Sequence, residues 1–152
     1  MSKPVQESWK SPPSGNCFCS LLRRVSRNAT NIYDRHLEPT GLTVTQYALL
    51  VNIARNTAAT PTELAEILGM DRTTVKRDLA PLERMGLIDT VSHSDKRFRP
   101  VALTPAGKTL LPIAYERWAA AQEDIIDLLG IRQVENLRKI LAITIETLGA
   151  AR

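Results

Sequence analysis

The sequence has few of the residues from which enzymatic and metal sites are usually built. Its 152 residues include only two cysteines and two histidines. We find no glycine-rich phosphate loop, paired-histidine zinc pattern or Ser-His-Asp arrangement. No apolar run approaches the roughly 20 residues that span a bilayer, and the start has no signal-peptide core. We therefore expect a cytoplasmic protein that is not an enzyme, needs no cofactor or metal and does not enter a membrane.

The charge balance is mildly basic, and its distribution says more than its size. Lys and Arg number 20 against 16 Asp and Glu, which gives a net charge of +4. Many of the basic residues fall in one stretch: Arg72, Lys76, Arg77, Arg84, Lys96, Arg97 and Arg99. Such clustering is typical of a surface that binds nucleic acid.

Residues 60–107 organise the rest of the chain. Thr60 and Glu63 have the spacing of a capping box, Pro61 suits the first helical position, and Gly69 can end the helix in a left-handed conformation. Its apolar face is expected at Leu64, Ile67 and Leu68. The sequence therefore predicts a short helix directly before the basic stretch.

A second helix is predicted over residues 71–85, with Asp71 as its cap and Gly86 just after its end. Its buried face is expected at Val75, Leu79 and Leu82. The opposite face carries a polar and basic stripe: Thr73, Lys76, Arg77, Ala80 and Arg84. Two helices joined by so short a turn form a helix-turn-helix, and this stripe suits phosphates and base edges in a major groove.

A hairpin is predicted next, with strands at 87–91 and 98–103 around a polar loop. A hairpin after a recognition helix is a wing, here 88–101, whose arginines can enter a neighbouring minor groove. Pro81 should kink or loosen the recognition helix, and Pro100 is tolerable only where its nitrogen faces no strand partner. Thr104 and Pro105 then restart a helix.

The stretch TPTELAEILGMDRTTVKRDLAPLERMGLI, followed by SDKRFRPVALTPAG, resembles the winged helix-turn-helix core of the multiple antibiotic resistance regulator (MarR) family. The Asp95-Lys96-Arg97 triplet, with Leu103, Thr104 and Gly107 behind it, matches that family's wing signature. The resemblance implies a homodimeric transcriptional regulator with a pocket between its DNA-binding lobe and its dimer helices, often accepting a small aromatic acid.

We expect a repressor that reads a pseudo-palindromic double-stranded operator through helix 71–85 and wing 88–101, and that a small molecule releases. The residues expected to contact DNA are Arg72, Thr73, Thr74, Lys76, Arg77, Arg84, Asp95, Lys96, Arg97 and Arg99. A winged-helix module that binds protein instead of DNA is the alternative, and the basic recognition face argues against it.

Helical periodicity extends to both ends of the chain. Helices are expected over residues 17–37, with a seam at Phe18, Leu22, Val25, Ala29 and Ile32, and over 43–56, with Tyr47, Leu50, Val51 and Ala54 inward. Two more are expected, over 104–129, where Pro112 should bend the helix, and after Gly130. One winged-helix lobe cannot bury the seams of the first helix and the last two, so we expect them to pack with their copies from a second subunit.

The expected fold is therefore mainly α with a small β-hairpin wing (α+β): a winged helix-turn-helix lobe plus a helical dimerisation lobe. Residues 1–16 form a flexible arm, 17–42 the first helix of the dimerisation lobe, 43–103 the DNA-binding lobe and 104–152 the C-terminal dimerisation helices.

Cys17 and Cys19 offer the one hint of how the protein is controlled. They lie at a predicted helix N-terminus, with Arg23 four residues after Cys19, where a thiol pKa falls. Cys19 also stands where the hydroperoxide-sensing branch of the family has its reactive cysteine, and Tyr33 matches one supporting tyrosine, although Arg23 and Val44 replace the other two. Peroxide sensing, a packing role and, less favoured, metal binding or a thiol enzyme stay open.

Overall fold

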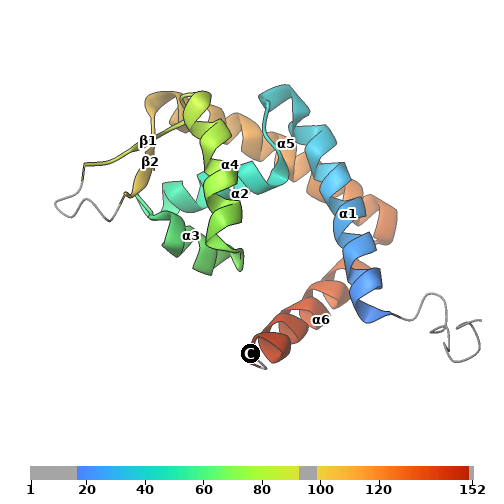
Figure 1. Ribbon diagram of the computed structural model, residues 1–152. Helices are drawn as coiled ribbons and strands as arrows, with labels where there is room; N and C mark the ends of the chain where they lie inside the picture. Colours follow the sequence, from blue (N-terminus) through green and yellow to red (C-terminus); the bar gives the residue numbers. More distant parts are fainter. Residues whose placement is uncertain (1–16, 93–98, 151–152) are drawn as a thin grey trace, which may run out of the picture.

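The computed structural model describes residues 17–92 and 99–150 (Figure 1). In chain order the elements are α1 (Phe18–Leu37), the short 3-10 helix η2 (Glu38–Thr40), α2 (Val44–Arg55), α3 (Pro61–Leu68), α4 (Arg72–Arg84), β1 (Ile88–Thr90), β2 (Val101–Leu103), α5 (Pro105–Leu129) and α6 (Ile131–Gly149). The mainly helical fold with a small antiparallel hairpin confirms the prediction of fold class.

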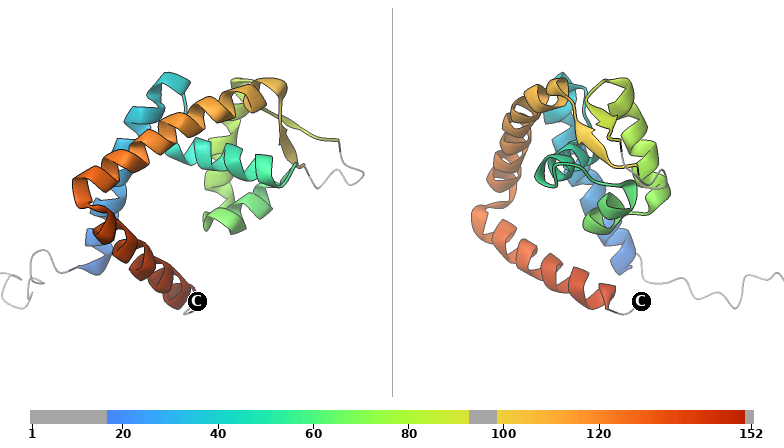
Figure 2. Two further views of the ribbon diagram at one scale, coloured as in Figure 1. Left: turned by 180° about the vertical axis from the view of Figure 1, so that it is seen from behind. Right: turned by 90° about the vertical axis from the view of Figure 1, so that its left-hand side faces the viewer.

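The elements separate into a central region, residues 43–103, and three outer helices, α1, α5 and α6 (Figures 1 and 2). Helices α1 and α5 pack against each other, and His36 Nε2 on α1 lies 2.6 Å from Asp124 Oδ2 on α5. Helix α6 begins after Gly130, where the chain turns back from α5, and runs below the central region in both views of Figure 2. It packs on α5 near its own start, where Val134 is buried.

Local capping signals define how the helices of the central region begin. Thr60 Oγ1 accepts from the Glu63 amide at 3.2 Å, and Glu63 Oε2 accepts from the Thr60 amide at 2.7 Å. This is the expected capping box, and Gly69 follows in the expected left-handed conformation, with φ 62°. Asp71 caps α4, also as predicted, and Gly86 follows α4 with φ 69°. The ends of α3 and α4 are therefore set by local capping residues and by the glycines that follow each helix.

The core of the central region lies between α2, α3, α4 and the hairpin, and it also includes Leu37 at the end of α1 and Ala114 of α5. Val75, Leu79 and Leu82 of α4 are all buried, as predicted. The predicted inward faces of α2 and α3 were wrong at Ala54 and Ile67, which are exposed. Helix α2 instead buries Tyr47, Leu49, Leu50 and Ile53. It is packed by α1, α3, α4, α5 and β2, so a helical pattern with one inward face cannot describe it.

The hairpin is shorter than expected. Strands β1 and β2 are antiparallel, with Ile88 opposite Leu103 and Thr90 opposite Val101, whereas the predicted strands began at 87 and 98. Pro100 directly precedes β2, and its carbonyl accepts from the Val91 amide at 2.8 Å. Proline is tolerated there because it contributes only its carbonyl to the pairing.

A third segment joins the hairpin. Ala59 pairs with Val101: the Ala59 amide donates to the Val101 carbonyl at 3.0 Å, and the Val101 amide donates back at 2.9 Å. This isolated bridge lies in the connection between two predicted helices, where the sequence indicated no strand. The base of the wing is tied to the connection between α2 and α3.

The start of α5 is locked to the end of the helix-turn-helix. The Thr104 amide donates to the Leu87 carbonyl at 3.1 Å, and the Thr104 hydroxyl donates to the Gly86 carbonyl at 2.6 Å. A Cβ at Gly107 would lie 2.1 Å from the Leu87 oxygen, so only glycine permits this approach. Gly107, which belongs to the expected wing signature, is thus a place where α5 packs closely against the chain leading into β1.

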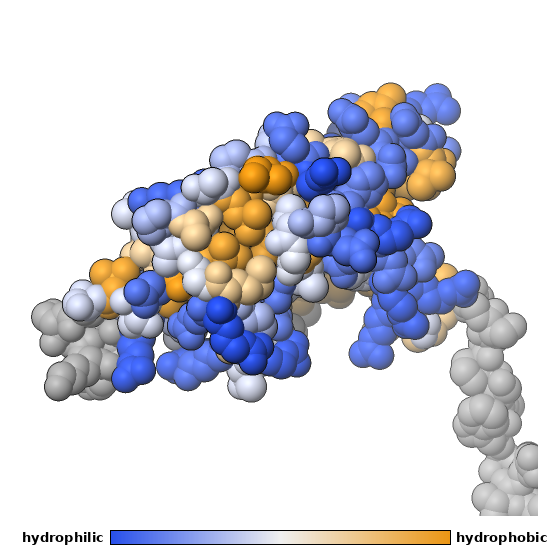
Figure 3. All heavy atoms as spheres, turned by 90° about the horizontal axis from the view of Figure 1, so that it is seen from above, coloured by the Kyte–Doolittle hydropathy of each residue, from blue (hydrophilic) through white to orange (hydrophobic). Residues whose placement is uncertain are grey.

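The outer helices leave many large apolar side chains uncovered. The exposed ones on these helices are Phe18, Leu21, Val25, Ile113, Tyr115, Leu128, Leu129, Ile131, Leu137, Ile140, Ile143, Ile145 and Leu148. Val134 is the one buried residue of α6. Figure 3 shows orange apolar side chains at the surface among blue hydrophilic ones. Helix α5 itself runs without interruption through Pro112.

Candidate nucleic-acid interface

The outer face of α4 is a continuous exposed stripe. Thr73, Lys76, Arg77, Ala80 and Arg84 are all exposed, as is Arg72 in the first turn. Helix α4 also continues through Pro81, which cannot donate to the Arg77 carbonyl four residues earlier. The structure therefore presents the basic residues of this helix together on one exposed face.

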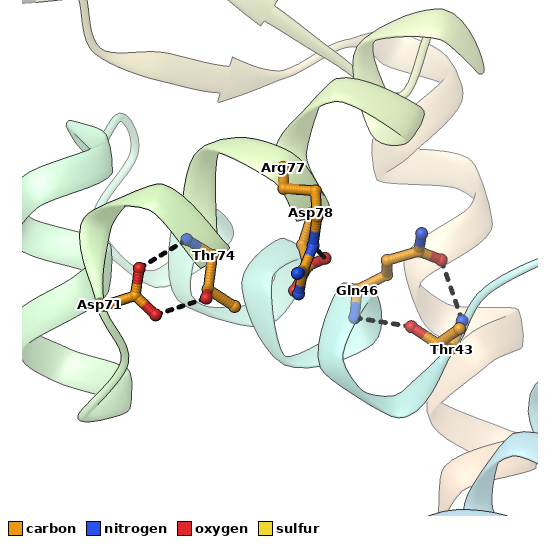
Figure 4. Close-up of polar contacts among 6 residues, drawn as sticks. All are labelled: Thr43, Gln46, Asp71, Thr74, Arg77 and Asp78. Atoms are coloured by element: carbon orange, nitrogen blue, oxygen red, sulfur yellow. Dashed lines mark hydrogen bonds and ion pairs between the residues drawn. The ribbon is translucent and has the colours of Figure 1, made fainter.

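Thr74 is a predicted contact residue whose polar groups already have a partner within the protein. Its amide donates to Asp71 Oδ1 at 2.8 Å and its hydroxyl donates to Asp71 Oδ2 (Figure 4). The hydroxyl bond first, and then the amide bond, hold the pKa of the Asp71 carboxyl below its ordinary value. Thr74 is half-buried, and its hydroxyl proton is used inside the protein.

Arg77 is held by a neighbour that the sequence did not suggest. Its Nε lies 3.3 Å from Oδ1 of Asp78, and Figure 4 shows the two side chains lying against each other. Consecutive helix positions do not normally face each other, which is why the pattern of the stripe excluded Asp78.

The predicted wing contacts divide into two groups. Asp95, Lys96 and Arg97 lie outside the described residues. Arg99 is described and is exposed two residues before β2. It stands at the foot of the hairpin that Ala59 anchors.

A cavity of about 1190 Å³ lies between α2, β2 and the first half of α5. Its walls are largely apolar and aromatic, with Tyr47 and Trp118 among them. The ring centroid of Trp118 is 6.0 Å from those of both Tyr47 and Tyr115. Burial raises the pKa of Tyr47, and the neighbouring Tyr115 adds to the effect. Arg55, Lys108 and Glu116 also line this cavity, so it combines aromatic walls with two cations and one carboxylate.

Both cysteines are free thiols on the surface. Cys17 is the residue just before α1, and Cys19 lies in its first turn. A side-chain hydrogen bond with Ser20 lowers the pKa of the Cys17 thiol, helped by the Ser20 backbone and less strongly by Arg23. The sequence favoured Cys19, but the thiol with this acidifying contact is Cys17.

Within 17–92 and 99–150, no three His, Cys, Asp or Glu side chains are grouped so that they could hold a metal ion. In the same part of the chain, no helix is long and apolar enough to cross a membrane.

Known proteins share both the sequence pattern and the fold. A family model described as the MarR family matches residues 40–97. The multiple antibiotic resistance protein MarR of Salmonella typhimurium is 30% identical over 98 residues, which cover 64% of this chain and 68% of that protein. The solved structure of the transcriptional regulator MosR of M. tuberculosis in complex with DNA is 32% identical, with a TM-score of 0.79, and covers 90% of this chain and 98% of that one. A probable transcriptional regulator from Pseudomonas aeruginosa is 25% identical, with a TM-score of 0.77 and coverage of 85% and 97%.

Proposed function

The chain belongs to the MarR family of DNA-binding transcriptional regulators, and from that premise we propose that it acts as a homodimeric repressor released by a small molecule. In this proposal, residues 43–103 form the DNA-binding lobe. Residues 17–42 and 104–152 supply the dimerisation lobe.

The observation that carries the proposal is the exposed basic face of the capped helix α4. Together with its caps, this helix is the recognition helix 71–85, whose first half reaches base edges in the major groove. The wing 88–101 supplies phosphate and minor-groove contacts through Lys96, Arg97 and Arg99, beside Asp95. The remaining contacts come from the helix: Arg72, Thr73, Thr74, Lys76, Arg77 and Arg84.

The test is binding to the DNA that flanks the protein's own gene, measured by fluorescence anisotropy. Arg77→Ala should weaken specific binding by about 1–3 kcal/mol per half-site if the arginine contacts a base. Arg35→Ala is the matched control, because Arg35 is an equally charged, exposed residue on α1. Equal affinities for wild type and Arg77→Ala would remove α4 from the binding surface.

The dimer proposal rests on the uncovered apolar side chains of α1, α5 and α6. One copy of the chain leaves Ile140, Ile143, Ile145 and Leu148 of α6 all more than half exposed. Isolated exposed apolar residues are ordinary, but a helix that projects with so many of them marks an interaction surface. A symmetric second copy would cover them and set two recognition helices about one DNA turn apart.

The effector proposal rests on the cavity beside Trp118. Its aromatic walls suit a planar ligand, and Arg55 and Lys108 suit a carboxylate, so an aromatic acid is the proposed class. Benzoate should release the protein from its DNA, and Trp118→Ala should weaken that response while leaving DNA binding without benzoate intact. Unchanged release by benzoate in Trp118→Ala would place the effector elsewhere.

A second candidate function, peroxide sensing, is favoured by the exposed thiols at the start of α1. Oxidation to a sulfenic acid would make a thiol bulkier and more polar beside the outer helices. DNA release by cumene hydroperoxide should be compared in wild type, Cys19→Ser and Cys17→Ser. Release that disappears in one of these variants supports sensing by that thiol. Equal release in all three, or none in any, assigns control to a ligand.

A further inference from the structure

Arg77 does not extend freely from α4 but is paired through one specific atom. Its Nε–H donates to Asp78 Oδ1 at 3.3 Å. The Arg77 side chain is 72% exposed and the Asp78 side chain 22% exposed. The pair thus joins an exposed cation to a largely buried carboxylate.

The choice of atom decides what the guanidinium can still do. Arginine has five N–H donors in a planar fork, and a contact at Nε leaves the four donors on the two terminal nitrogens. Those nitrogens can pair with O6 and N7 of guanine in an end-on arrangement. A side-on arrangement needs Nε itself, which Asp78 occupies.

We propose that Asp78 is a positioning residue that holds Arg77 for end-on reading of a guanine. This inference rests on the proposed role of α4 as the recognition helix. It adds a residue that touches no DNA itself but selects how its neighbour does.

The surroundings of Asp78 suit that role. It lies between Leu79, which is buried, and Arg77, with the buried Val75 one turn before it. Its limited exposure restricts the positions its carboxylate can take. Asp71, the carboxylate that caps the start of α4, is already used by Thr74. Asp78 is therefore placed to lower the entropy that Arg77 loses on binding.

The Asp78 carboxylate should favour binding to a guanine through Arg77 but weaken binding to unselected DNA. A negative charge on the recognition helix repels phosphates, so it weakens binding to any sequence. Specificity is the difference between the affinity for a guanine-containing site and the affinity for unselected DNA. Asp78 increases this difference because it raises the first affinity and lowers the second. A residue needed only for folding would change both affinities in the same direction.

The experiment uses a randomised double-stranded DNA library, because no operator has to be known. The wild type, Arg77→Ala, Asp78→Ala and Asp78→Asn are each used to select from it, and the affinity of each for an unselected duplex is measured. We expect the wild type to select a guanine in each half-site. That preference should fall about tenfold in Arg77→Ala and about three- to tenfold in Asp78→Ala.

Asp78→Asn separates orientation from charge. Its amide oxygen can still accept from Arg77 Nε, so the guanine preference should survive, while affinity for the unselected duplex rises about twofold or more. Loss of affinity for all DNA in both Asp78 variants, with unchanged base preference, would reduce Asp78 to a structural residue and overturn the inference. A wild type that selects sequences but no guanine sensitive to Arg77 would also overturn it. A wild type that selects no sequence would instead contradict the proposed function.

Discussion

The central region and the outer helices handle their apolar side chains in opposite ways. In residues 43–103, Leu49, Leu50, Ile53, Leu64, Val75 and Leu82 have no exposed surface. On α6, Ile145 is 73% exposed and Ile140 60%. The two parts are built from similarly apolar residues, so composition does not separate them.

The difference lies in how many neighbours each helix has within one chain. Helix α2 is surrounded by five elements, whereas α6 packs mainly on α5. A helix with one neighbour can bury only part of a wide apolar face. The central region therefore buries most of its apolar side chains within one copy of the chain, whereas α6 does not, as expected if the proposed dimer covers the outer helices.

The largest effect should come from charging the outer helices. Ile140→Glu places a carboxylate in the proposed dimer surface twice, and loses about 3–6 kcal/mol of apolar burial for the two copies together. We expect monomers by light scattering at micromolar protein, with the central region still folded by hydrogen exchange. Ala142→Glu is the control, because Ala142 is exposed on the polar face of α6 with Glu135 and Glu146. A dimeric Ile140→Glu protein would contradict the idea that the apolar face of α6 is covered by a partner.

The joint between the two parts should give the next largest effect. Gly107→Ala forces a Cβ to 2.1 Å from the Leu87 oxygen, and we expect a loss of about 3 kcal/mol in the free energy of unfolding. Gly149→Ala is the matched helical control, with nothing within 4 Å of its Cβ. It should be neutral, or stabilise by up to about 1 kcal/mol. Urea unfolding of both variants measures the contrast, and equal stabilities would mean that the junction can yield.

A smaller effect should be confined to the central region. Thr60→Ala removes the cap that the Glu63 amide uses, which costs about 1 kcal/mol of folding free energy. The dimer affinity should stay unchanged, because Thr60 lies away from α1, α5 and α6. Urea unfolding at high and low protein concentration separates the two quantities. A change in dimer affinity would show that the two parts are coupled more tightly than their packing indicates.

The smallest effect is a pH dependence within the same region. Hydrogen bonds from Thr74 lower the pKa of folded Asp71, so the cap stabilises the protein above the pKa of unfolded Asp71. That contribution disappears as the pH falls through the folded value. Asp71→Asn keeps a capping oxygen but does not titrate, so its unfolding free energy should fall less on acidification. Identical pH profiles of unfolding for the two proteins would exclude Asp71 from acid sensitivity.

The features of the fold that could be predicted from the sequence are those that depend on residues close together in the chain. The caps at Thr60 and Asp71, the stop at Gly69 and the buried face of α4 all depend on contacts within a few residues. Ala54 and Ile67 were misplaced because burial on α2 and α3 depends on elements far away in the chain. The pairing of Ala59 with Val101 spans 42 residues by their numbers and leaves no local pattern.

The candidate site likewise has features that follow from local sequence and features that depend on the folded chain. Helical spacing was enough to place Lys76, Arg77 and Arg84 on one exposed face. It was not enough to find Asp78, because that contact depends on the side-chain rotamer of Arg77. The cavity beside Trp118 was expected only from family resemblance, since its walls come from α2, β2 and α5 and meet only in the folded chain.

The locked start of α5 also has a mechanical consequence. Because Thr104 and Gly107 join this end to the chain between α4 and β1, we expect α5 and α4 to turn together. The helix has 25 residues, and at about 1.5 Å per residue it is a lever about 37 Å long. By that length, a tilt of only about 5° moves its far end by about 3 Å. In the proposed mechanism, a ligand that acts on the outer helices would therefore need to displace them by only about 3 Å to turn each proposed recognition helix out of alignment with its groove.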